Sequence, residues 1–332
     1  MKRFTALKFA AIAATGALAL TACGSNDSGS NDAAKTDEPV KIGIAQYVSH
    51  PSLDAVAAGF KKGMESAGYT GDKISYDENN AQGDQATNTS MVGKLASDSD
   101  VDLVLAIATP TAQAAAQAIT SIPVVFPAVP DPVDAKLVAS NEAPGANVTG
   151  TSDKNPVKEQ LELLKELAPE AKDVGIVYSS GEANSAVQVQ WAKDAAAELG
   201  LTIKEAAISA PSEVQQAASS LDVDAFYVPT DNAVVSALEG LLQNAQSKKV
   251  PVISADGESV KRGATATYGI NYEKLGEQTA AMAVKILKGE AKPAEMPVET
   301  ISQVELYLNE GAAKKVGIEF SEDMKAKAVQ TY

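Results

Sequence analysis

The sequence predicts an α/β protein made of two doubly wound lobes, each built around a parallel sheet, and joined by a three-segment hinge. Three observations predict this fold. Short runs rich in Val and Ile alternate with segments whose apolar residues recur at helical spacing, as expected for buried parallel strands connected by helices. The order of these segments is repeated in the two halves of the chain. A further strand, a long helix and a closing segment then follow without a counterpart in the first half.

The internal repeat is visible in three pairs of segments that occur in the same order. Each half reads as strand, helix, strand, helix, strand, helix, strand, which implies a parallel sheet with right-handed crossovers. The paired segments are VKIGIAQ (40–46) with KDVGIVY (172–178), DVDLVLAIATPTAQAAAQAI (100–119) with DVDAFYVPTDNAVVSALEGL (222–241), and IPVVFPA (122–128) with VPVISAD (250–256).

The chain is expected to pass between the lobes three times. The first change of lobe is placed near GANVTGTSD (145–153), after a Pro-rich loop. The late helix is expected to return to the first lobe, and the segment 298–309 (VETISQVELYLN) to belong to the second. The expected domains are therefore an N-terminal lobe of residues 40–148 and 265–293 and a C-terminal lobe of residues 149–264 and 294–332.

The amino terminus predicts export and attachment to a membrane. Residues 1–22 have a basic start and an apolar run too short to span a bilayer, as in a signal peptide. The run ends in Leu-Thr-Ala-Cys, which resembles the bacterial lipobox and implies acylation of Cys23, the only cysteine in the chain. Residues 23–39 are polar and read as a flexible tether. The alternative is an ordinary secretion signal in which Cys23 is incidental.

The composition excludes several classes of function. A formal net charge of −15 argues against nucleic acid and against a broad basic membrane-binding face. With one histidine and one cysteine, the chain lacks the ligands of a Cys- or His-rich zinc site. The glycines of QGDQ do not follow the phosphate-loop pattern. On these counts only a carboxylate-rich metal site remains possible. We expect no metal and no cofactor.

A ligand site is expected where the carboxyl ends of the two sets of strands face each other. Helix starts there offer free N–H groups to a carboxylate, nearby Asp side chains offer partners for an ammonium, and aromatic residues can pack against a ring. The loops are 46–53, 79–85, 108–111 and 127–132 in the first half, and 178–185, 207–212, 229–233 and 254–258 in the second. The carboxylates are Asp84, Asp131, Asp231 and Asp256, and the aromatic residues are Tyr47, Phe126, Tyr178, Tyr268 and Tyr272.

Each of these residues also has a structural interpretation. Thr109 before Pro110, and Asp231 before Asn232, are sequences typical of a helix start, where they would only cap the helix. Asp131 lies between two prolines and suits a turn. The tyrosines suit packing within a lobe, His50 suits the rim of a cleft, and Trp191 suits packing in the middle of a helix.

Seven segments together resemble the substrate-binding lipoproteins of tryptophan/tyrosine-type ABC importers, from about residue 40 to about residue 320. They are SHPSLDA, NNAQGDQ, LAIATPTAQ, DPVDAKLV, NVTGTSD, YVPTDNAV and TYGINYEKLGEQT. The resemblance implies a type I periplasmic-binding-protein fold and a cleft for Trp, Tyr or Phe. It implies partnership with an ABC permease and its ATPase, and an extracytoplasmic, lipid-anchored monomer. The matching positions that would contact the ligand are Gln46, His50, Ser52, Thr109, Ser185, Thr230, Asp231 and Asp256.

Two alternatives remain open at this point. Related families with the same fold bind branched amino acids or purines, so the ligand class is less secure than the fold. An enzyme on the same scaffold would need a nucleophile with its base, or a metal, in the cleft. His50 has no evident Asp-His-Ser partnering, which favours binding over catalysis. A transcriptional regulator would need a basic helix-turn-helix where this chain has its signal and tether.

Overall fold

The computed structural model describes residues 38–301 and 304–332 of the chain. The expected signal peptide (1–22), Cys23 and most of the tether (23–39) lie outside the described residues. None of the described helices is both long and apolar enough to cross a membrane.

The first lobe is built on a six-stranded, wholly parallel sheet. Its strand order is β11-β5-β4-β3-β1-β2, so β1 and β3 are central. Both strands have helices on each face, and their residues are mainly apolar, as the sequence predicts for buried parallel strands. The strands are β1 (Val40–Gln46), β2 (Ile74–Asn80), β3 (Leu103–Ile107), β4 (Val124–Phe126), β5 (Val148–Ser152) and β11 (Glu299–Thr300).

The second lobe is built on a seven-stranded sheet of order β13-β12-β10-β9-β8-β6-β7. All of its pairings are parallel except that between β10 and β12, which is antiparallel. The strands are β6 (Asp173–Ser179), β7 (Thr202–Ile208), β8 (Ala225–Val228), β9 (Val252–Ser254), β10 (Ala266–Gly269), β12 (Glu305–Leu308) and β13 (Gln330–Thr331).

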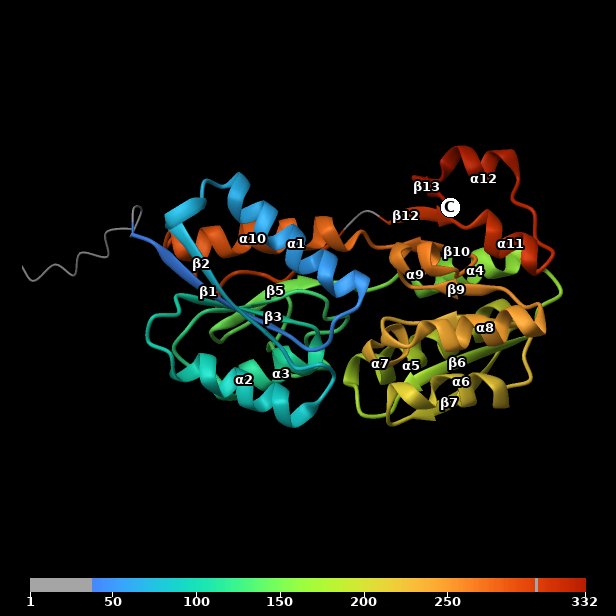
Figure 1. Ribbon diagram of the computed structural model, residues 1–332, viewed down its shortest axis with the longest axis horizontal. Coiled ribbons are helices and arrows are strands. Elements are labelled where there is room, and N and C mark those ends of the chain that lie inside the picture. The colour runs from blue at the N-terminus through green and yellow to red at the C-terminus, as the bar shows by residue number, and fades with distance from the viewer. Residues whose placement is uncertain (1–37, 302–303) are drawn as a thin grey trace, which may run out of the picture. The chain divides into compact units, whose positions relative to one another are not determined.

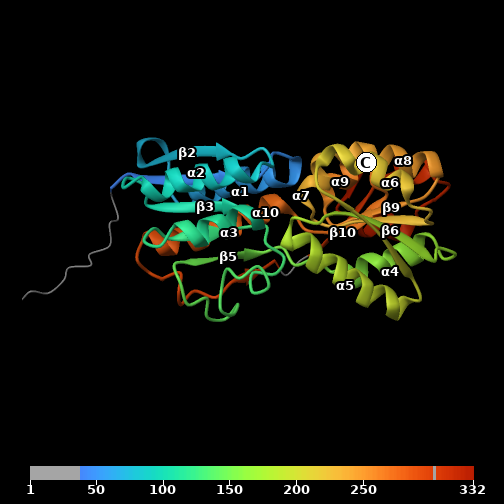
Figure 2. The same ribbon diagram turned by 90° about the horizontal axis from the view of Figure 1, so that it is seen from below.

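Helices cover both faces of each sheet. In Figure 1, α1 and α10 lie on one side of β1 and β3, and α2 and α3 lie on the other. In Figure 2, α6 and α8 lie on one side of β6 and β9, and α4 and α5 lie on the other. The first-lobe helices are α1 (Pro51–Ser66), α2 (Gln85–Ser97), α3 (Thr109–Ala118) and α10 (Tyr272–Leu287). The second-lobe helices are α4 (Val157–Leu167), α5 (Ala183–Leu199), α6 (Val214–Ser220), α7 (Asn232–Ser236), α8 (Leu238–Lys248), α9 (Gly257–Arg262), α11 (Glu310–Lys315) and α12 (Glu322–Lys327).

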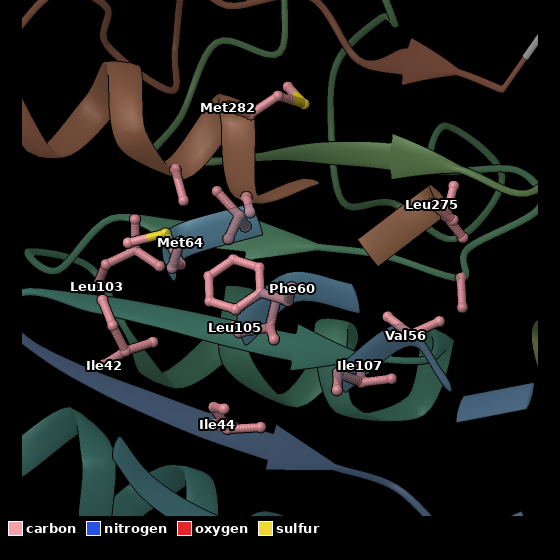
Figure 3. Close-up of a cluster of buried hydrophobic side chains, with 14 of the residues drawn as sticks. Ile42, Ile44, Val56, Phe60, Met64, Leu103, Leu105, Ile107, Leu275 and Met282 are labelled. Carbon is pink, nitrogen blue, oxygen red and sulfur yellow. The ribbon is translucent and has the colours of Figure 1, made fainter. Parts of the chain in front are cut away.

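The late helix α10 packs on the first lobe against α1, as expected from the sequence (Figure 1). Glycines allow the two backbones to approach closely. A Cβ on Gly276 would lie 2.2 Å from the carbonyl oxygen of Val56, and one on Gly59 would lie 2.0 Å from that of Glu273. Figure 3 shows Phe60 of α1 beside Leu105 of β3, in the apolar layer between the first sheet and α10.

The boundaries of the lobes differ from the expected ones at three places, because strand pairing assigns the segments. Residues 148–152 form β5, which pairs with β4 of the first sheet, although the C-terminal lobe was expected to begin at 149. Residues 266–269 form β10 of the second sheet, although the first lobe was expected to resume at 265. The segment 298–309 is divided between β11 in the first sheet and β12 in the second. The chain still passes between the sheets three times, after β5, β10 and β11.

Candidate functional site

A small buried cavity lies between the two lobes, at the carboxyl ends of their strands. It is lined by His50, Ser52, Leu53, Ala128, Asp153, Asn184, Thr230, Asp231, Asn232, Val235, Asp256 and Tyr272. Its volume of about 20 Å³ has room for roughly one water molecule. A larger ligand can therefore enter only if the lobes or the lining side chains move.

A larger depression, of about 380 Å³, lies on the second lobe alone, between α8, α9 and α11. Its Arg262 is already engaged, because its guanidinium donates to both carboxylate oxygens of Glu239. The cavity between the lobes is the better candidate site, because several buried polar groups converge there from both sheets.

A hydrogen bond crosses the cavity from one lobe to the other. The hydroxyl of Ser52, in the first turn of α1, donates to Oδ1 of Asp256 at 2.9 Å. Asp256 also caps α9, accepting from the backbone N–H of Ser259 at 2.8 Å and from its hydroxyl at 2.8 Å. The α1 start is positioned by Pro51, which suits the first helical turn, and by the β1–α1 loop before it.

In the second lobe, a network of carboxylates and amides surrounds the start of α7. Asp231 caps this helix through the N–H of Val234 at 2.8 Å and accepts the N–H of Ser179 at 2.5 Å. Glu182 accepts from the N–H groups of Asn232 and Ala233. Both carboxylates therefore accept hydrogen bonds from the start of α7, and these bonds stabilise the buried carboxylates.

Three residues that line the cavity each have a buried polar atom without a hydrogen-bond partner. These atoms are Oδ1 of Asp153, Oδ1 of Asn184 and Nδ1 of His50. Asp153 is 1% exposed, and its other oxygen accepts from the Tyr272 hydroxyl at 2.6 Å. Because a buried polar group without a partner is costly, its presence in a cavity points to a ligand group that completes it.

The electrostatics of the cavity favour a cationic group. Desolvation by burial raises the pKa of Asp153 to about 6 and, helped by the charge of Asp231, raises that of Glu182 to about 7. Burial also raises the pKa of Asp231. Desolvation lowers the pKa of His50 to about 4, so this imidazole is neutral at physiological pH. No lysine or arginine lines the cavity, so the carboxylates there lack a basic partner.

Two alanines of the first lobe have left-handed backbones, and one of them, Ala128, lines the cavity. Ala108 has φ of 77° and Ala128 has φ of 58°. The N–H of Ala108 donates to the carbonyl of Pro127 at 3.2 Å, which ties the two loops together. Strained backbones of this kind persist where the surroundings hold them, often at binding sites. They hold the loop that leads into α3, whose first residue is Thr109.

Of the eight ligand contacts expected from the sequence, five line the cavity: His50, Ser52, Thr230, Asp231 and Asp256. Gln46 instead holds the β1–α1 loop, donating to the Val48 carbonyl at 2.9 Å and to Asp54 at 2.7 Å. Ser185 is fully buried in α5 and does not line the cavity. Thr109 is the first residue of α3 rather than its cap, and its buried hydroxyl has no partner.

Several other residues singled out in the sequence have structural roles. Asp84 caps α2 by accepting the N–H of Thr87, and Asp131 accepts two N–H groups of its own turn. Phe126 is fully buried in the first-lobe core. Trp191 packs on the second-lobe core, with the Lys154 ammonium 5.1 Å from its ring centre. Among the five aromatic residues proposed near the cleft, Tyr272 lines the cavity.

The residues missed by the sequence analysis are Leu53, Ala128, Asp153, Asn184, Asn232 and Val235. In the sequence, Asn184 and Asn232 are marked only as polar residues at expected helix starts. Asp153 is marked only as the last residue of the segment 145–153, where the chain was expected to change lobe. The three apolar residues carry no signal that separates them from core residues. In the described part of the chain, no group of three or more His, Cys, Asp or Glu side chains is arranged to hold a metal ion.

Comparisons with known proteins agree with this architecture. The chain is 43% identical over 307 residues to a "Tyrosine-binding protein" of Clostridioides difficile, covering 90% of this chain and 88% of that protein. It is 38% identical to an ABC domain from Streptococcus pneumonia crystallised in complex with L-Trp, with a TM-score of 0.86, covering 89% of this chain and all of that one.

A third comparison bears on the conformation. A ligand-free, open substrate binding protein with adhesive properties from Clostridium difficile is 46% identical to this chain. It covers 88% of this chain and all of its own, yet its TM-score is only 0.67. The structure thus resembles the L-Trp complex more than the open form, despite the lower sequence identity. This agrees with the small cavity and with the Ser52–Asp256 hydrogen bond between the lobes.

The family model described as "ABC transporter substrate binding protein" matches residues 41–332, which is the whole two-lobed body. The fold is that of type I periplasmic binding proteins. With two lobes facing each other across a cavity of converging polar groups, the chain belongs to the family of ABC transporter substrate-binding proteins.

Proposed function

We propose that this protein captures an aromatic amino acid in the cavity between its lobes and delivers it to an ABC permease. One observation carries the proposal: the cavity holds a buried carboxylate oxygen without a partner, on Asp153, and neither lysine nor arginine lines it. An α-ammonium group would complete this oxygen and balance the charge. The names of the two relatives, one tyrosine-binding and one in complex with L-Trp, support the aromatic class.

A further partner for an amino acid lies at the end of a first-lobe strand. The start of α3, which follows β3 and does not itself line the cavity, carries an unpartnered buried hydroxyl on Thr109 that suits a carboxylate. Leu53, Ala128 and Val235 give the cavity an apolar side that suits a ring. Closure of the lobes around the ligand then presents one combined surface to the permease.

The binding step can be tested by calorimetry and thermal unfolding with a panel of amino acids. At 100 times its dissociation constant, a ligand should stabilise the protein by about 2.7 kcal/mol. We expect Trp, Tyr or Phe to do so, and indole-3-propionate, which lacks the ammonium, to fail. A stabilising branched-chain amino acid with no effect of any aromatic one would contradict the proposal. Mass spectrometry should recover the bound compound unchanged, as expected of a binding protein rather than an enzyme.

We also propose that the mature protein is a monomer held at the membrane by lipid on Cys23. The lipobox-like segment 20–23 and the polar residues after it support this. Acyl chains on one residue give firm anchoring, since each buried methylene contributes about 0.8 kcal/mol. Metabolic labelling with an alkyne fatty acid should mark the wild type but not Cys23→Ala, which should appear in the culture medium. Labelling of both proteins would contradict the anchor.

A further inference from the structure

Asp153 and Tyr272 form a buried hydrogen-bonded pair at the wall of the cavity. The Tyr272 hydroxyl donates to Oδ2 of Asp153 at 2.6 Å, while Oδ1 of the same carboxylate has no partner. Both residues line the cavity, and they are 1% and 4% exposed. The tyrosine therefore occupies one of the two carboxylate oxygens and leaves the other unpaired.

Both members of the pair are attached to the first lobe. Asp153 directly follows β5, and Tyr272 is the first residue of α10. The same strand and helix are also joined by the hydroxyls of Thr151 and Thr279, which lie 2.7 Å apart. The pair therefore does not depend on contact with the second lobe, and we expect it to persist when the lobes separate.

The Tyr272 hydroxyl also acts on the charge of the carboxylate. Burial raises the pKa of Asp153 to about 6, and the hydrogen bond from Tyr272 opposes this rise because it stabilises the ionised form. The phenol keeps its own proton, since burial and the nearby carboxylate raise the pKa of Tyr272 well above its usual value. An ammonium group pairs with the ionised carboxylate, so the hydroxyl increases the fraction of the protein that is ready to bind it.

We infer that Tyr272 is a positioning residue for ligand capture: its hydroxyl holds one oxygen of an ionised Asp153 and leaves the other for the ammonium of the ligand. This rests on the proposed function and deepens it. The sequence singled out Tyr272 as a ring that could pack against the ligand, whereas here it acts through its hydroxyl. Because the pair is complete within one lobe, the partner of the ammonium is in place before the lobes close.

The test measures ligand affinity by calorimetry between pH 5 and 7.5. The probe is whichever of Trp, Tyr and Phe binds the wild type most tightly, and its ammonium stays charged over this range. In Tyr272→Phe the carboxylate loses a bond that favours ionisation, so the pKa of Asp153 should rise. The affinity should then begin to fall at a higher pH than in the wild type. The deficit of the variant should grow by about 3- to 10-fold between pH 7.5 and 5, because a tenfold change in an ionisation constant gives up to a tenfold change in affinity.

Other titratable groups around the cavity are common to both proteins. They are His50 before α1, Glu182 before α5, Asp231 before α7 and Asp256 before α9. The charge of Asp256 also raises the pKa of Asp153, and it does so with and without the Tyr272 hydroxyl. These contributions therefore cancel in the ratio of the two affinities at each pH.

Tyr307→Phe is the matched control. The Tyr307 hydroxyl also donates to a carboxylate, that of Glu305, but neither residue lines the cavity. This variant loses a hydrogen bond of the same kind and should keep the wild-type dependence of affinity on pH. In the Asp153→Asn background, Tyr272→Phe should add no pH-dependent loss, because the amide does not ionise.

A second change alters the hydrogen bond without removing it. 3-Fluorotyrosine incorporated at position 272 is a more acidic phenol of nearly the same size, so it donates a stronger hydrogen bond to Asp153. The fall in affinity should then begin at a lower pH than in the wild type. This measurement decides the inference if Tyr272→Phe does not fold, and an unchanged pH profile would overturn it.

The outcomes separate the inference from the proposed function. A loss of affinity in Tyr272→Phe that is equal at every pH would show a merely structural role, and no loss at all would show no role. Either result overturns the inference and leaves the proposed function standing. If no aromatic amino acid binds the wild type at any pH, the proposed function itself is wrong.

Discussion

Ser52 of the first lobe and Asp256 of the second are joined by a 2.9 Å hydrogen bond between the Ser52 hydroxyl and the Asp256 carboxylate. The two residues are 204 positions apart in the chain and lie at the starts of α1 and α9, so this bond exists only when the lobes are together. Two residues that line the cavity therefore also hold the two lobes together.

Removing this link should favour the open form. Ser52→Ala deletes the donor, and a hydrogen bond to a charged group contributes about 1.5–3 kcal/mol. We expect the ligand affinity to fall by about tenfold or more, because closure is coupled to binding. Small-angle scattering of the ligand-free protein should give a larger radius of gyration than for the wild type.

Ser259→Ala provides the control for this change. Its hydroxyl donates to the same carboxylate at 2.8 Å, but from within α9 of the second lobe. We expect this variant to keep the wild-type radius of gyration. Equal opening in both variants would show that the carboxylate, rather than the contact between lobes, controls closure.

Asp153→Asn should separate binding from stability. Replacing the carboxylate removes the proposed partner of the ammonium, so the affinity for an aromatic amino acid should fall by about 30-fold or more. The ligand-free variant should be at least as stable as the wild type at pH 7.5, because an ionised buried carboxylate is lost. Calorimetry and urea unfolding measure the two effects. Asp131→Asn, in an exposed turn, should change neither, and unchanged binding by Asp153→Asn would refute its role.

The stability of the ligand-free protein should depend on pH through Glu182. Burial raises its pKa from 4.5 to about 7, so the folded state binds more protons than the unfolded state between those values. The free energy of unfolding of the wild type therefore falls, relative to Glu182→Gln, as the pH rises from 4.5 to 7. Between pH 4.5 and 7 the difference in unfolding free energy should shift in favour of the variant by about 1–3 kcal/mol.

Urea unfolding at several pH values between 5 and 8 checks this. His50 acts in the opposite direction, because its lowered pKa makes stability rise with pH between about 4 and 6.5. This contribution is common to both proteins and cancels in their difference. The exposed Glu142, changed to Gln, serves as the control for a surface carboxylate, and its substitution should change the free energy of unfolding by less than about 0.5 kcal/mol. A pH-independent effect of Glu182→Gln would contradict the prediction.

The contact between α1 and α10 should be intolerant of a methyl group. In Gly276→Ala the new Cβ would lie 2.2 Å from the Val56 carbonyl oxygen, so the helices must separate. We expect the free energy of unfolding to fall by about 2 kcal/mol or more, as for overpacked cores. Gly93→Ala, in α2 with no atom within 4 Å of the new Cβ, should instead add about 0.5–1 kcal/mol. Chemical denaturation measures both, and equal effects would be inconsistent with this packing.

The strands and the helices were predictable because their signals are local. Leu53, Val56, Phe60 and Met64 recur at helical spacing in α1 and are all buried. Gly200, in the left-handed conformation, ends α5, as a glycine after a helical run commonly does. The repeat of these local patterns was enough to predict two similar lobes.

The boundaries of the lobes were less predictable because they depend on pairing between distant strands. The short β5 carries Thr149, Thr151 and Ser152, which look like a loop in sequence, yet its Thr151 is buried and bonded to Thr279 of α10. Likewise β10 was assigned to the first lobe with the helix that follows it. Only its pairing with β9 and β12 reveals the second sheet.

By itself, the sequence determined the kind of protein: two α/β lobes, an acidic chain with a lipobox-like start, and helix starts gathered at one edge of each sheet. These features follow from composition and from short-range patterns, such as the 3.6-residue period of a helix and the runs of apolar residues in a buried strand. The tertiary structure alone decided which carboxylate is left unpaired. Asp153 becomes a candidate for the ammonium because Tyr272, 119 residues away, takes one of its oxygens, while burial removes water from the other. Burial and pairing of single side chains arise from contacts between distant segments, which no local pattern encodes.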